Sequence, residues 1–395
     1  MSSTVSPTVS LSEIVAIRHD LHAHPQLAYE ETYACETVQR ELTKAGIQFK
    51  AGLAGGTGVL GYLPATSNPD GAPTIALRAD MDALPIHEET GVAYASQTPG
   101  KMHACGHDGH TSILIGAAHA LAATAHRQNN VLFVFQPAEE GGAGGKRMVE
   151  DGCLSGRVLG KKADFMFGLH GWTTVQLGRV ETRIGSLMAA TDEFFITVHG
   201  QGGHAAAPNT TIDPIVISAH IVTALQSVVA RNTDPFDSVV VTVGEIHAGT
   251  AHNVIPMTAT LHGTIRTLTP ESRKSSVEAV RRLAERIAEG FGARTEFVHN
   301  EGYPVTSNHE DAVARFMKVA TQVVGAENVS DNAYPTMGGE DFSYYGAECP
   351  SCFYQLGLIP HGQSSYPSVH TPHFNFNDDA IEVGMKVMVA LALSE

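Results

Sequence analysis

A continuous apolar run of strand length, VLFVFQ, occupies residues 131–136. Two further runs of the same kind, TIALRA and DFMFGLH, occupy residues 74–79 and 164–170. Strands without polar alternation are typical of parallel sheets that are covered on both faces. Between TIALRA and VLFVFQ, the segment TSILIGAAHALAATAH (111–126) repeats apolar residues every three to four positions, which predicts a helix. The sequence therefore predicts an α/β domain with a mostly parallel sheet.

The pattern changes around residues 185–190, where alternation with a period near two replaces the continuous apolar runs. This alternation predicts half-exposed antiparallel strands in DEFFITVHG, SVVVTVGEIHAG and MTATLHGTIRTLT. One helical segment, 213–232, follows the first of these strands, and another, 270–292, leads to a last strand, RTEFVHN (294–300). Strand, helix, two strands, helix, strand is the ferredoxin-like order.

We therefore expect a ferredoxin-like α+β lid domain at residues 188–300, inserted into a catalytic domain that comprises residues 1–187 and 301–395. The patterns outside the predicted lid indicate two opening helices near 11–23 and 29–46, and a closing helix, strand and helix at 310–324, 352–358 and 378–393.

Length and charge narrow the classes of function. A chain of 395 residues is too long for one core and implies two or so domains of roughly 100–200 residues each. The formal charge of −16, from 25 basic and 41 acidic residues, opposes binding to phosphate backbones and anionic membrane surfaces. We therefore expect no nucleic-acid partner and no membrane association.

The start of the sequence and the cysteines indicate the compartment. MSSTVSPTVSLSEIV lacks the basic region and the apolar run of a signal peptide, and no stretch of about 18 apolar residues follows. The five cysteines are odd in number and scattered, which argues against a disulfide framework. We assign the isolated C-x-x-C pair, Cys349 and Cys352, to packing. These features predict a cytoplasmic protein.

Side chains of metal-ligand type lie near the ends of the predicted strands. In open α/β sheets, sites form outside the carboxyl ends of the strands, where such side chains converge. Thiolate, imidazole and carboxylate groups together suit a divalent transition ion such as zinc, manganese, cobalt or nickel. The candidates are Glu139 and Glu140 after 131–136, His170 at the end of 164–170, Cys105 and His107 before 111–126, and His370 beyond 352–358.

The spacing of these candidates predicts which of them bind a metal ion and which transfers a proton. If the Cys-Gly-His segment is extended, Cys105 and His107 point to the same side and bind the same ion, and a thiolate can bridge a second ion. Adjacent Glu139 and Glu140 cannot point the same way if extended, so one can ligate while the other accepts a proton from an activated water. Asp82 suits a position where it hydrogen-bonds a ligand imidazole and fixes its tautomer.

Other interpretations stay open on the residues alone. A lone histidine at a strand end is commonly a satisfied core or surface residue, an adjacent glutamate pair is commonly solvated, and a single cysteine is commonly a small buried apolar residue. Cys105 and His107 also fit a thiol enzyme, which needs no metal ion. A dipeptidase or aminopeptidase on the same metals, and a catalytically silent metal-binding or peptide-binding protein, are further alternatives. The joint placement of the candidates favours the metal-dependent enzyme.

Ordered motifs along nearly the whole chain resemble the amidohydrolase branch of the co-catalytic metallopeptidases, which includes hippurate hydrolases, N-acyl-amino-acid amidohydrolases and plant auxin-conjugate hydrolases. The motifs are RHDLHAHPQLAYEE (18–31), LRADMDALPI, MHACGHDGHTS, QPAEEGGAGG, GLHGW, GQGGHAAAP, AHNVIPMTATLHGTIR, MGGEDFSYY and VHTPHFNFND. The resemblance implies a two-domain fold with a ferredoxin-like lid and a homodimer or higher homo-oligomer formed through that lid.

The resemblance also implies the roles of individual residues. Cys105 would bridge two divalent metal ions, with zinc or manganese expected first and cobalt or nickel tolerated. His107 and His170 would complete one coordination sphere, Glu140 and His370 the other, and Glu139 would be the general base. The wider superfamily has a histidine ligand two residues before the equivalent of Asp82. Because this chain has Asp80 there, Asp80 is not assigned as a ligand.

Motifs in the lid segment and after it resemble the family's substrate-binding groups. His204 resembles the lid histidine that reaches the reacting carbonyl, which matches the need for polar groups where charge develops on oxygen. Asn253 and Arg266 resemble groups that bind the substrate carboxylate or the oxyanion, and the Gly338-Gly339 turn could hold the substrate backbone. The implied reaction is hydrolysis of the amide bond of a small N-acyl or N-aroyl amino acid.

Overall fold

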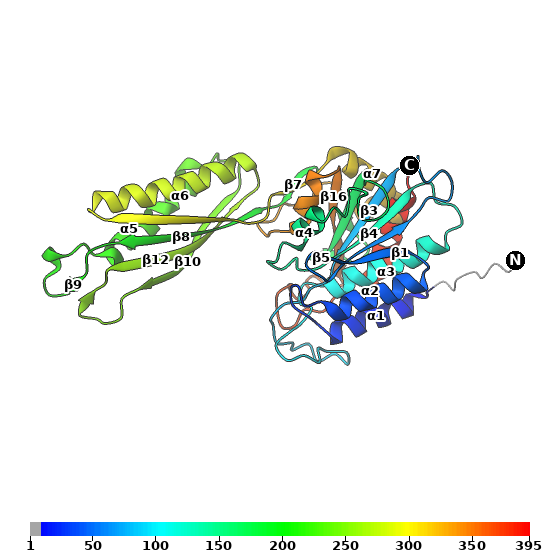
Figure 1. Cartoon of the computed structure of the whole chain (residues 1–395), viewed down its shortest axis with the longest axis horizontal. Coiled ribbons are helices and arrows are strands. Elements are labelled where there is room, and N and C mark those ends of the chain that lie inside the picture. The colour runs from blue at the N-terminus through cyan, green and yellow to red at the C-terminus, as the bar shows by residue number, and fades with distance from the viewer. Residues whose placement is uncertain (1–8) are drawn as a thin grey trace. The chain divides into compact units, whose positions relative to one another are not determined.

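The computed structural model describes residues 9–395. Residues 1–8, where the segment examined for a signal peptide begins, lie outside the described residues. Contacts divide the chain into two compact units (Figure 1). The first unit comprises the described residues up to Gly185 together with Ser307–Tyr334 and Asp341–Glu395, and the second comprises Ser186–Thr306 and Pro335–Glu340.

The first unit is built on an eight-stranded sheet with the strand order β1-β2-β4-β3-β5-β16-β6-β15. Four parallel strands form its centre: β4 (Asn130–Gln136), β3 (Thr74–Asp80), β5 (Phe165–Gln176) and β16 (Ser351–Ile359). Every residue of β3, β4 and β16 is buried, as expected for strands that are apolar on both faces. The predicted α/β class with a mostly parallel sheet is confirmed.

Short strands at the edges of this sheet were not predicted. An antiparallel hairpin, β1 (Gln48–Leu53) and β2 (Gly58–Leu63), pairs with β4 on one side. On the other side, β6 (Val180–Glu181) pairs with β16 and β15 (Val329–Ser330). The segments QFKAGL and GVLGYL are short and interrupted by glycine, so neither shows a continuous or a strictly alternating pattern.

Helices enclose the apolar core of the first unit. Helix α1 begins with a capping box, in which Ser10 and Glu13 satisfy each other's backbone amides. Helix α3 is buried over most of its length, because nearly all of its side chains are small or apolar, and it packs against α1 and α8. The helices are α1 (Leu11–Ala23), α2 (Thr32–Lys44), α3 (His107–Ala123), α4 (Gly144–Glu150), α7 (Glu310–Val324) and α8 (Asp379–Leu393), with 3-10 turns at Ala326–Asn328 and Asp341–Ala347.

The second unit has the predicted ferredoxin-like order. Its antiparallel sheet runs β10-β12-β8-β13, and Phe194, Ile221 and Val280 contribute to the core between sheet and helices. The elements are β8 (Ala190–His199), α5 (Pro214–Ser227), β10 (Val239–Ala248), β12 (Thr258–Thr267), α6 (Pro270–Gly290) and β13 (Arg294–Glu301). A 3-10 turn at Pro208–Thr210 and a small sheet of β9 (Gly203–His204) and β11 (Val254–Ile255) complete the unit. The strands β7 (Gly185–Met188) and β14 (Thr306–Asn308) pair with each other where the chain passes from one unit to the other.

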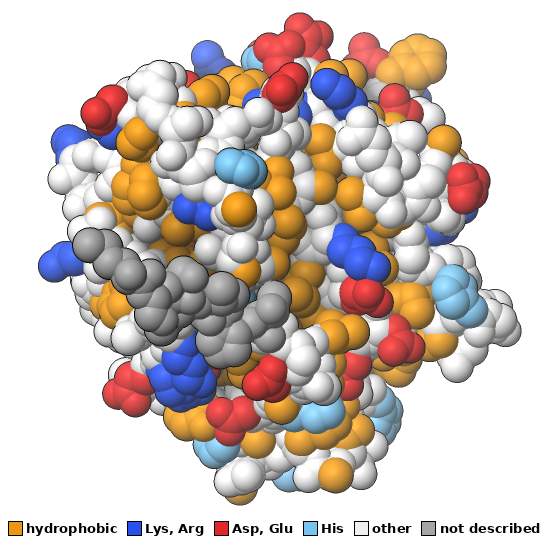
Figure 2. Space-filling model, turned by 90° about the vertical axis from the view of Figure 1, so that its right-hand side faces the viewer, with side chains coloured by type: hydrophobic (Ala, Val, Ile, Leu, Met, Phe, Trp, Pro, Cys, Tyr) orange, Lys and Arg blue, Asp and Glu red, His pale blue; other side chains and the backbone are white. Residues whose placement is uncertain are grey.

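One helical stretch among the described residues has the length and apolar composition of a membrane span. It joins α5 to a π-helical turn and covers Pro214–Asn232. Its buried side chains, including Ile217, Ile221 and Leu225, belong to the core of the second unit, while Ile215 and Val216 are exposed. Figure 2 shows acidic and basic side chains scattered over one face of the molecule, with no continuous basic area in view.

Candidate metal centre

The candidate ligands of the first unit gather at the carboxyl ends of the parallel strands. Strand β3 ends at Asp80, two residues before Asp82, and β4 ends at Gln136, three residues before Glu139. His170 does not end its strand as predicted, because β5 continues to Gln176. The last residue of β5 that pairs with β3 is Gly168, opposite Arg78, so His170 lies just beyond the end of that pairing.

The Cys-Gly-His segment is not extended, so the predicted backbone geometry is wrong, although Cys105 and His107 do come together. Gly106 has a φ of +93° and is the N-cap of α3, and His107 is the first residue of the helix. A β-carbon at Gly106 would lie 2.9 Å from the Phe376 ring. A residue without a side chain is therefore needed to turn the chain from Cys105 into the helix.

The sulfur of Cys105 lies between two imidazoles. Cys105 Sγ is 3.3 Å from His170 Nε2 and 3.3 Å from His370 Nε2. His370 Nε2 is also 3.2 Å from Glu140 Oε1. His370 has a φ of +61°, which few non-glycine residues adopt, in the loop after β16. The structure therefore brings together ligand candidates that are up to 265 residues apart in the sequence.

Two groups of three potential ligands share Cys105. In the first group, atoms of Cys105, His107 and His170 all lie within 4.8 Å of one another, and in the second the same holds for Cys105, Glu140 and His370. Soft sulfur, imidazole and carboxylate donors at such distances fit divalent transition ions. The described residues thus form two adjoining ligand sets with one common member.

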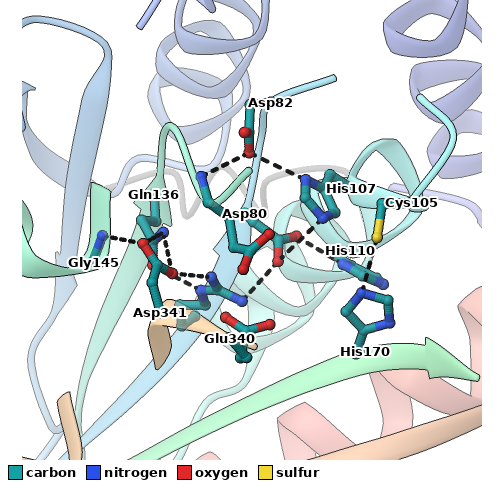
Figure 3. Close-up of polar contacts among 12 residues, drawn as sticks. Asp80, Asp82, Cys105, His107, His110, Gln136, Gly145, His170, Glu340 and Asp341 are labelled. Atoms are coloured by element: carbon teal, nitrogen blue, oxygen red, sulfur yellow. Dashed lines mark hydrogen bonds and ion pairs between the residues drawn. The ribbon is translucent and has the colours of Figure 1, made fainter. Parts of the chain in front are cut away.

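The orientation of the imidazoles also fits metal ions. His107 Nδ1 lies 3.1 Å from Asp82 Oδ1, while the buried Nε2 of His107 makes no hydrogen bond among the described residues and lies 3.7 Å from Asp80 Oδ2 (Figure 3). His170 Nδ1 lies 2.8 Å from the carbonyl oxygen of Gly171, which directs Nε2 toward Cys105. A buried ring nitrogen that makes no hydrogen bond is suited to ligate a cation.

Asp82 also fixes the two glutamates. The amides of Glu139 and Glu140 donate to the two oxygens of Asp82, at 3.0 and 2.9 Å. The preceding Ala138 has a φ of +56°, so the segment is not extended and the predicted opposite directions of the two side chains do not apply. Carboxylate oxygens of Glu139 and Glu140 and a ring nitrogen of His107 lie within 4.8 Å of one another.

The electrostatics of the ligand set favour a bound cation. Burial alone would lower the pKa of His107, but the carboxylates of Asp80 and Asp82 raise it well above its usual value. Hydrogen bonds to Cys105 and Glu140 raise the pKa of His370 to about 10. Burial, then the Glu140 charge, raises the pKa of the Cys105 thiol. A metal ion that binds here must therefore compete with protons for these three ligands.

A buried polar network beside the ligands was missed by the sequence reasoning. His110 Nδ1 is 2.7 Å from Asp80 Oδ1, and the Gly171 amide donates to His110 Nε2 at 2.8 Å. Arg78 donates to Asp80 Oδ2 at 2.7 Å and to Asp341 at 3.1 Å. The only signal in the sequence was a charged residue, Arg78, inside an otherwise apolar strand.

This network explains how Asp80 is used. Atoms of Asp80, His107 and His110 lie within 4.8 Å of one another, which makes Asp80 a further potential ligand. Both of its oxygens are already engaged, by His110 and by Arg78, and its Oδ2 is 3.7 Å from His107 Nε2. The omission of Asp80 from the predicted ligands agrees with these contacts.

An aromatic side chain adjoins the centre on the same strand. Trp172 follows His170 by two residues on β5, and its ring is edge-on to the His170 ring with 5.7 Å between centroids. Side chains two residues apart on a strand lie on the same face. Trp172 is therefore an immediate neighbour of a candidate ligand.

The predicted substrate-binding residues all lie in the second unit. His204, on β9, is exposed, and the amide of the next residue, Ala205, donates to the Asn253 carbonyl at 3.0 Å, so His204 and Asn253 lie close together. Arg266, on β12, pairs with Thr191 of β8, and burial lowers the pKa of its guanidinium.

The glycine pair of the second unit packs on the start of β8. A β-carbon at Gly339 would lie 2.3 Å from Thr191 Cγ2, and the Gly338 carbonyl accepts from the Ala189 amide at 2.9 Å. Gly339 and Arg266 are therefore both neighbours of Thr191. Within the first unit, the candidate ligands lie close to one another. Within the second unit, His204 lies close to Asn253, and Arg266 and Gly339 are both neighbours of Thr191.

A mostly parallel α/β unit with clustered sulfur, imidazole and carboxylate ligands, and a ferredoxin-like second unit, define the class of two-domain metal-dependent hydrolases. The chain belongs to peptidase family M20/M25/M40, whose family model matches residues 76–394. Its predicted resemblance to the amidohydrolase branch of the metallopeptidases is confirmed by the relatives.

Two relatives and one solved structure match along almost the whole chain. An IAA-amino acid hydrolase ILR1-like 2 of Arabidopsis thaliana is 39% identical, over 96% of this chain and 84% of its own. An N-acetylcysteine deacetylase of Bacillus subtilis is 37% identical, over 97% of this chain and 96% of its own. The Bacillus subtilis YXEP protein, a dinuclear metal binding peptidase from the M20 family, has a TM-score of 0.82 and 33% identity, with 97% of each chain covered.

Proposed function

We propose that this protein hydrolyses the amide bond of N-acyl or N-aroyl amino acids and releases a carboxylic acid and a free amino acid. The observation that carries the proposal is the sulfur of Cys105, 3.3 Å from the Nε2 atoms of both His170 and His370, beside the buried carboxyl group of Glu139. The names of the two relatives support the substrate class, because each describes an enzyme that acts on an amino acid with an acyl group.

In this proposal, the centre holds two divalent metal ions. Cys105, His107 and His170 would hold one ion, and Cys105, Glu140 and His370 would hold the other. The donors suit zinc or manganese first and tolerate cobalt or nickel. When bound, the ions would activate a water molecule and polarise the carbonyl group of the substrate.

Glu139 acts as general base and then as general acid. Its carboxylate takes a proton from the attacking water and returns that proton to the amine nitrogen as the C–N bond breaks. Asp82 keeps the backbone of Glu139 and the ring of His107 in place by accepting their hydrogen bonds. Hydrolysis then needs no nucleophile from the protein.

The second unit supplies the remaining groups. We assign it as the lid and dimerisation domain of the protein, with residues 188–300 as its main segment. His204 stabilises the oxyanion, Asn253 and Arg266 bind the substrate carboxylate or the oxyanion, and the Gly338-Gly339 turn holds the substrate backbone. We also propose that the protein is cytoplasmic and that it forms a homodimer or higher homo-oligomer. Sedimentation of the purified protein tests the oligomeric state directly.

The decisive test combines metal analysis with substitution of Glu139. Purified protein is analysed for metal content and assayed with N-acetyl, N-benzoyl and indole-acyl amino acids. Glu139→Gln should retain about two ions per chain and lose at least ~100-fold in kcat, because the base is absent while the ligands remain. Glu150→Gln, an exposed glutamate of α4, is the matched control and should keep full activity. Full activity of Glu139→Gln would exclude the role of Glu139.

The same assay separates the alternative functions. A dipeptidase or aminopeptidase would prefer unacylated dipeptides to their acylated forms, and a thiol enzyme would resist chelators and form a covalent adduct at Cys105. Burial raises the pKa of the Cys105 thiol, which opposes a thiolate nucleophile. A protein that binds metal but turns over none of the substrates would support a silent binding function.

A further inference from the structure

The loop between β4 and α4 has a backbone that needs external support. It carries Glu139 and Glu140, and it places Ala138 and Ala143 at φ values of +56° and +54°. Residues other than glycine rarely adopt these angles, and such strain of about 1–3 kcal/mol per residue persists only where surrounding contacts impose it. The contacts that hold this loop therefore matter to the direction of the two glutamates.

A buried carboxylate from the start of α2 holds the first residue of the loop. Glu31 is 0% exposed, and its Oε1 accepts from the Ala138 amide at 2.8 Å. The same oxygen accepts from the Tyr29 amide at 2.9 Å, and Oε2 accepts from the Thr57 hydroxyl at 2.8 Å. The side chain of Glu31 does not cap α2, although Glu31 is its N-cap residue. Its hydrogen bonds instead hold the loop at Ala138 and the backbone amide of Tyr29, which lies in the segment 29–31 that precedes α2.

Glu31 and Asp82 together account for three consecutive amides. The amide of Ala138 donates to Glu31, and the amides of Glu139 and Glu140 donate to Asp82. Because a buried amide without an acceptor is costly, these two side chains fix three successive peptide groups of the loop, those of Ala138, Glu139 and Glu140. Burying a second carboxylate here is unfavourable unless all its bonds are made.

The segment of residues 29–31 contacts the loop at a second point. The Tyr29 hydroxyl donates to the Gly142 carbonyl, and the Arg147 guanidinium lies 4.2 Å from the centre of the Tyr29 ring. A β-carbon at Gly142 would lie 3.0 Å from the Tyr29 ring, so the approach requires glycine. Residues 29–31 thus contact the loop both before and after the two glutamates.

We propose that Glu31 is a positioning residue of the hydrolase, which fixes the peptide of Ala138 and thereby aims the Glu139 carboxylate at the reacting water. The proposal rests on the proposed function for Glu139. Glu31 is fully buried and its hydrogen bonds go to Tyr29, Thr57 and Ala138, so it acts through the loop backbone. The hydrogen bonds, not the charge, carry this role, because a single oxygen of Glu31 receives both backbone amides.

The experiment compares Glu31→Ala with Glu31→Gln. Alanine removes all three bonds, and we expect kcat to fall about 10- to 100-fold with KM within about threefold, because small misplacements of a catalytic group have effects of this size. Glutamine keeps an acceptor for both amides and a partner for Thr57, so it should retain more than half of the wild-type kcat. Glu41→Ala is the control, since Glu41 is an equally buried carboxylate of α2 that contacts Lys44, Arg40 and His119 instead.

Hydrogen exchange of the metal-free protein separates this proposal from the proposed function. Amides of 138–142 should exchange at least about tenfold faster in Glu31→Ala than in the wild type, and remain protected in Glu31→Gln and Glu41→Ala. Faster exchange in a protein that hydrolyses none of the N-acyl substrates would sink the function and keep the anchoring of the loop. Unchanged exchange, or a kcat loss in Glu31→Ala no larger than in Glu41→Ala, would overturn the role of Glu31.

Discussion

Asp82 is the residue on which the separate parts of the metal centre depend. Its two oxygens form hydrogen bonds with the ring of His107, 25 positions away, and with the amides of Glu139 and Glu140, more than 50 positions away. A neutral His107 must donate from Nδ1 to Asp82, which leaves the lone pair on Nε2. One carboxylate therefore sets both the tautomer of a ligand and the backbone that carries the base.

Replacing Asp82 with asparagine should weaken the whole centre. Asparagine offers one acceptor oxygen, so at least one of the three bonds is lost and an amide donor faces another donor. We expect metal affinity and kcat/KM to fall about 10- to 100-fold, measured by chelator competition and by turnover of an N-acyl amino acid. Asp164→Asn is the matched control, because Asp164 accepts an amide at 2.8 Å from Thr74, the residue that begins β3. Equal effects of the two substitutions would contradict the special role of Asp82.

At the scale of elements, sequence patterns predicted the helices and strands whose apolar faces pack into the core. They missed features that depend on the backbone angles of single residues. Helices α1 and α7 match their predicted ranges, since a capping box begins α1, and α7 has a strongly apolar face and ends at Gly325. Helix α3 begins four residues before its predicted start, because Gly106 turns the chain directly into it. The shared placement of Cys105 and His107 was anticipated from alternation, but a left-handed glycine produces it.

The candidate site divides in the same way. Side chains of metal-ligand type near the ends of the predicted strands pointed to Cys105, Glu139 and His370, which the structure gathers within the two ligand groups or beside them. His110 and Glu31 could not be found from periodicity or spacing. Each is a polar residue next to or inside an apolar segment, and its partners come from elements far away in the sequence. Long-range hydrogen bonds leave no local pattern.

The turn at Gly106 gives a prediction for α3. Alanine there must adopt a φ of +93° and place a β-carbon 2.9 Å from Phe376. We expect a loss of about 1–3 kcal/mol in unfolding free energy and a weaker metal site, because His107 moves with the helix. Gly46→Ala tests strain alone, since Gly46 has a φ of +68° and a β-carbon there would have no other atom within 4 Å. Retention of full metal affinity in Gly106→Ala would show that the turn does not position His107.

At the scale of the whole first unit, a buried ion cluster ties the N-terminal helix to the helix that carries a ligand. Arg18, on α1, contacts Asp108 of α3 at 3.1 Å, and His22, also on α1, contacts Asp108 at 2.9 Å. His22 further contacts Glu88 at 3.2 Å. Burial would lower the pKa of His22, but its hydrogen bond and its attraction to Asp108 raise the pKa to about 9.

Stability should therefore decline between neutral and alkaline pH. The pKa of His22 is higher in the folded state than its ordinary 6.5, so its contribution is complete below pH 6.5 and is lost as the pH rises through about 9. The difference corresponds to roughly 3 kcal/mol. Denaturant unfolding at pH 6 and pH 9.5 should show this decline in the wild type and in His126→Gln, an exposed control, but a smaller one in His22→Gln. Parallel declines in all three would contradict the assignment.

The chain contains a single tryptophan, and that tryptophan is Trp172 beside His170. Light emitted by an indole responds to charge and to ring nitrogens close by, so the intrinsic fluorescence of the unlabelled protein reports on one location. Addition of zinc or manganese to the chelator-treated enzyme should change this emission in a saturable way, and the titration should follow the recovery of turnover. The fluorescence of Trp172 should therefore report whether the neighbouring ligands hold a metal ion.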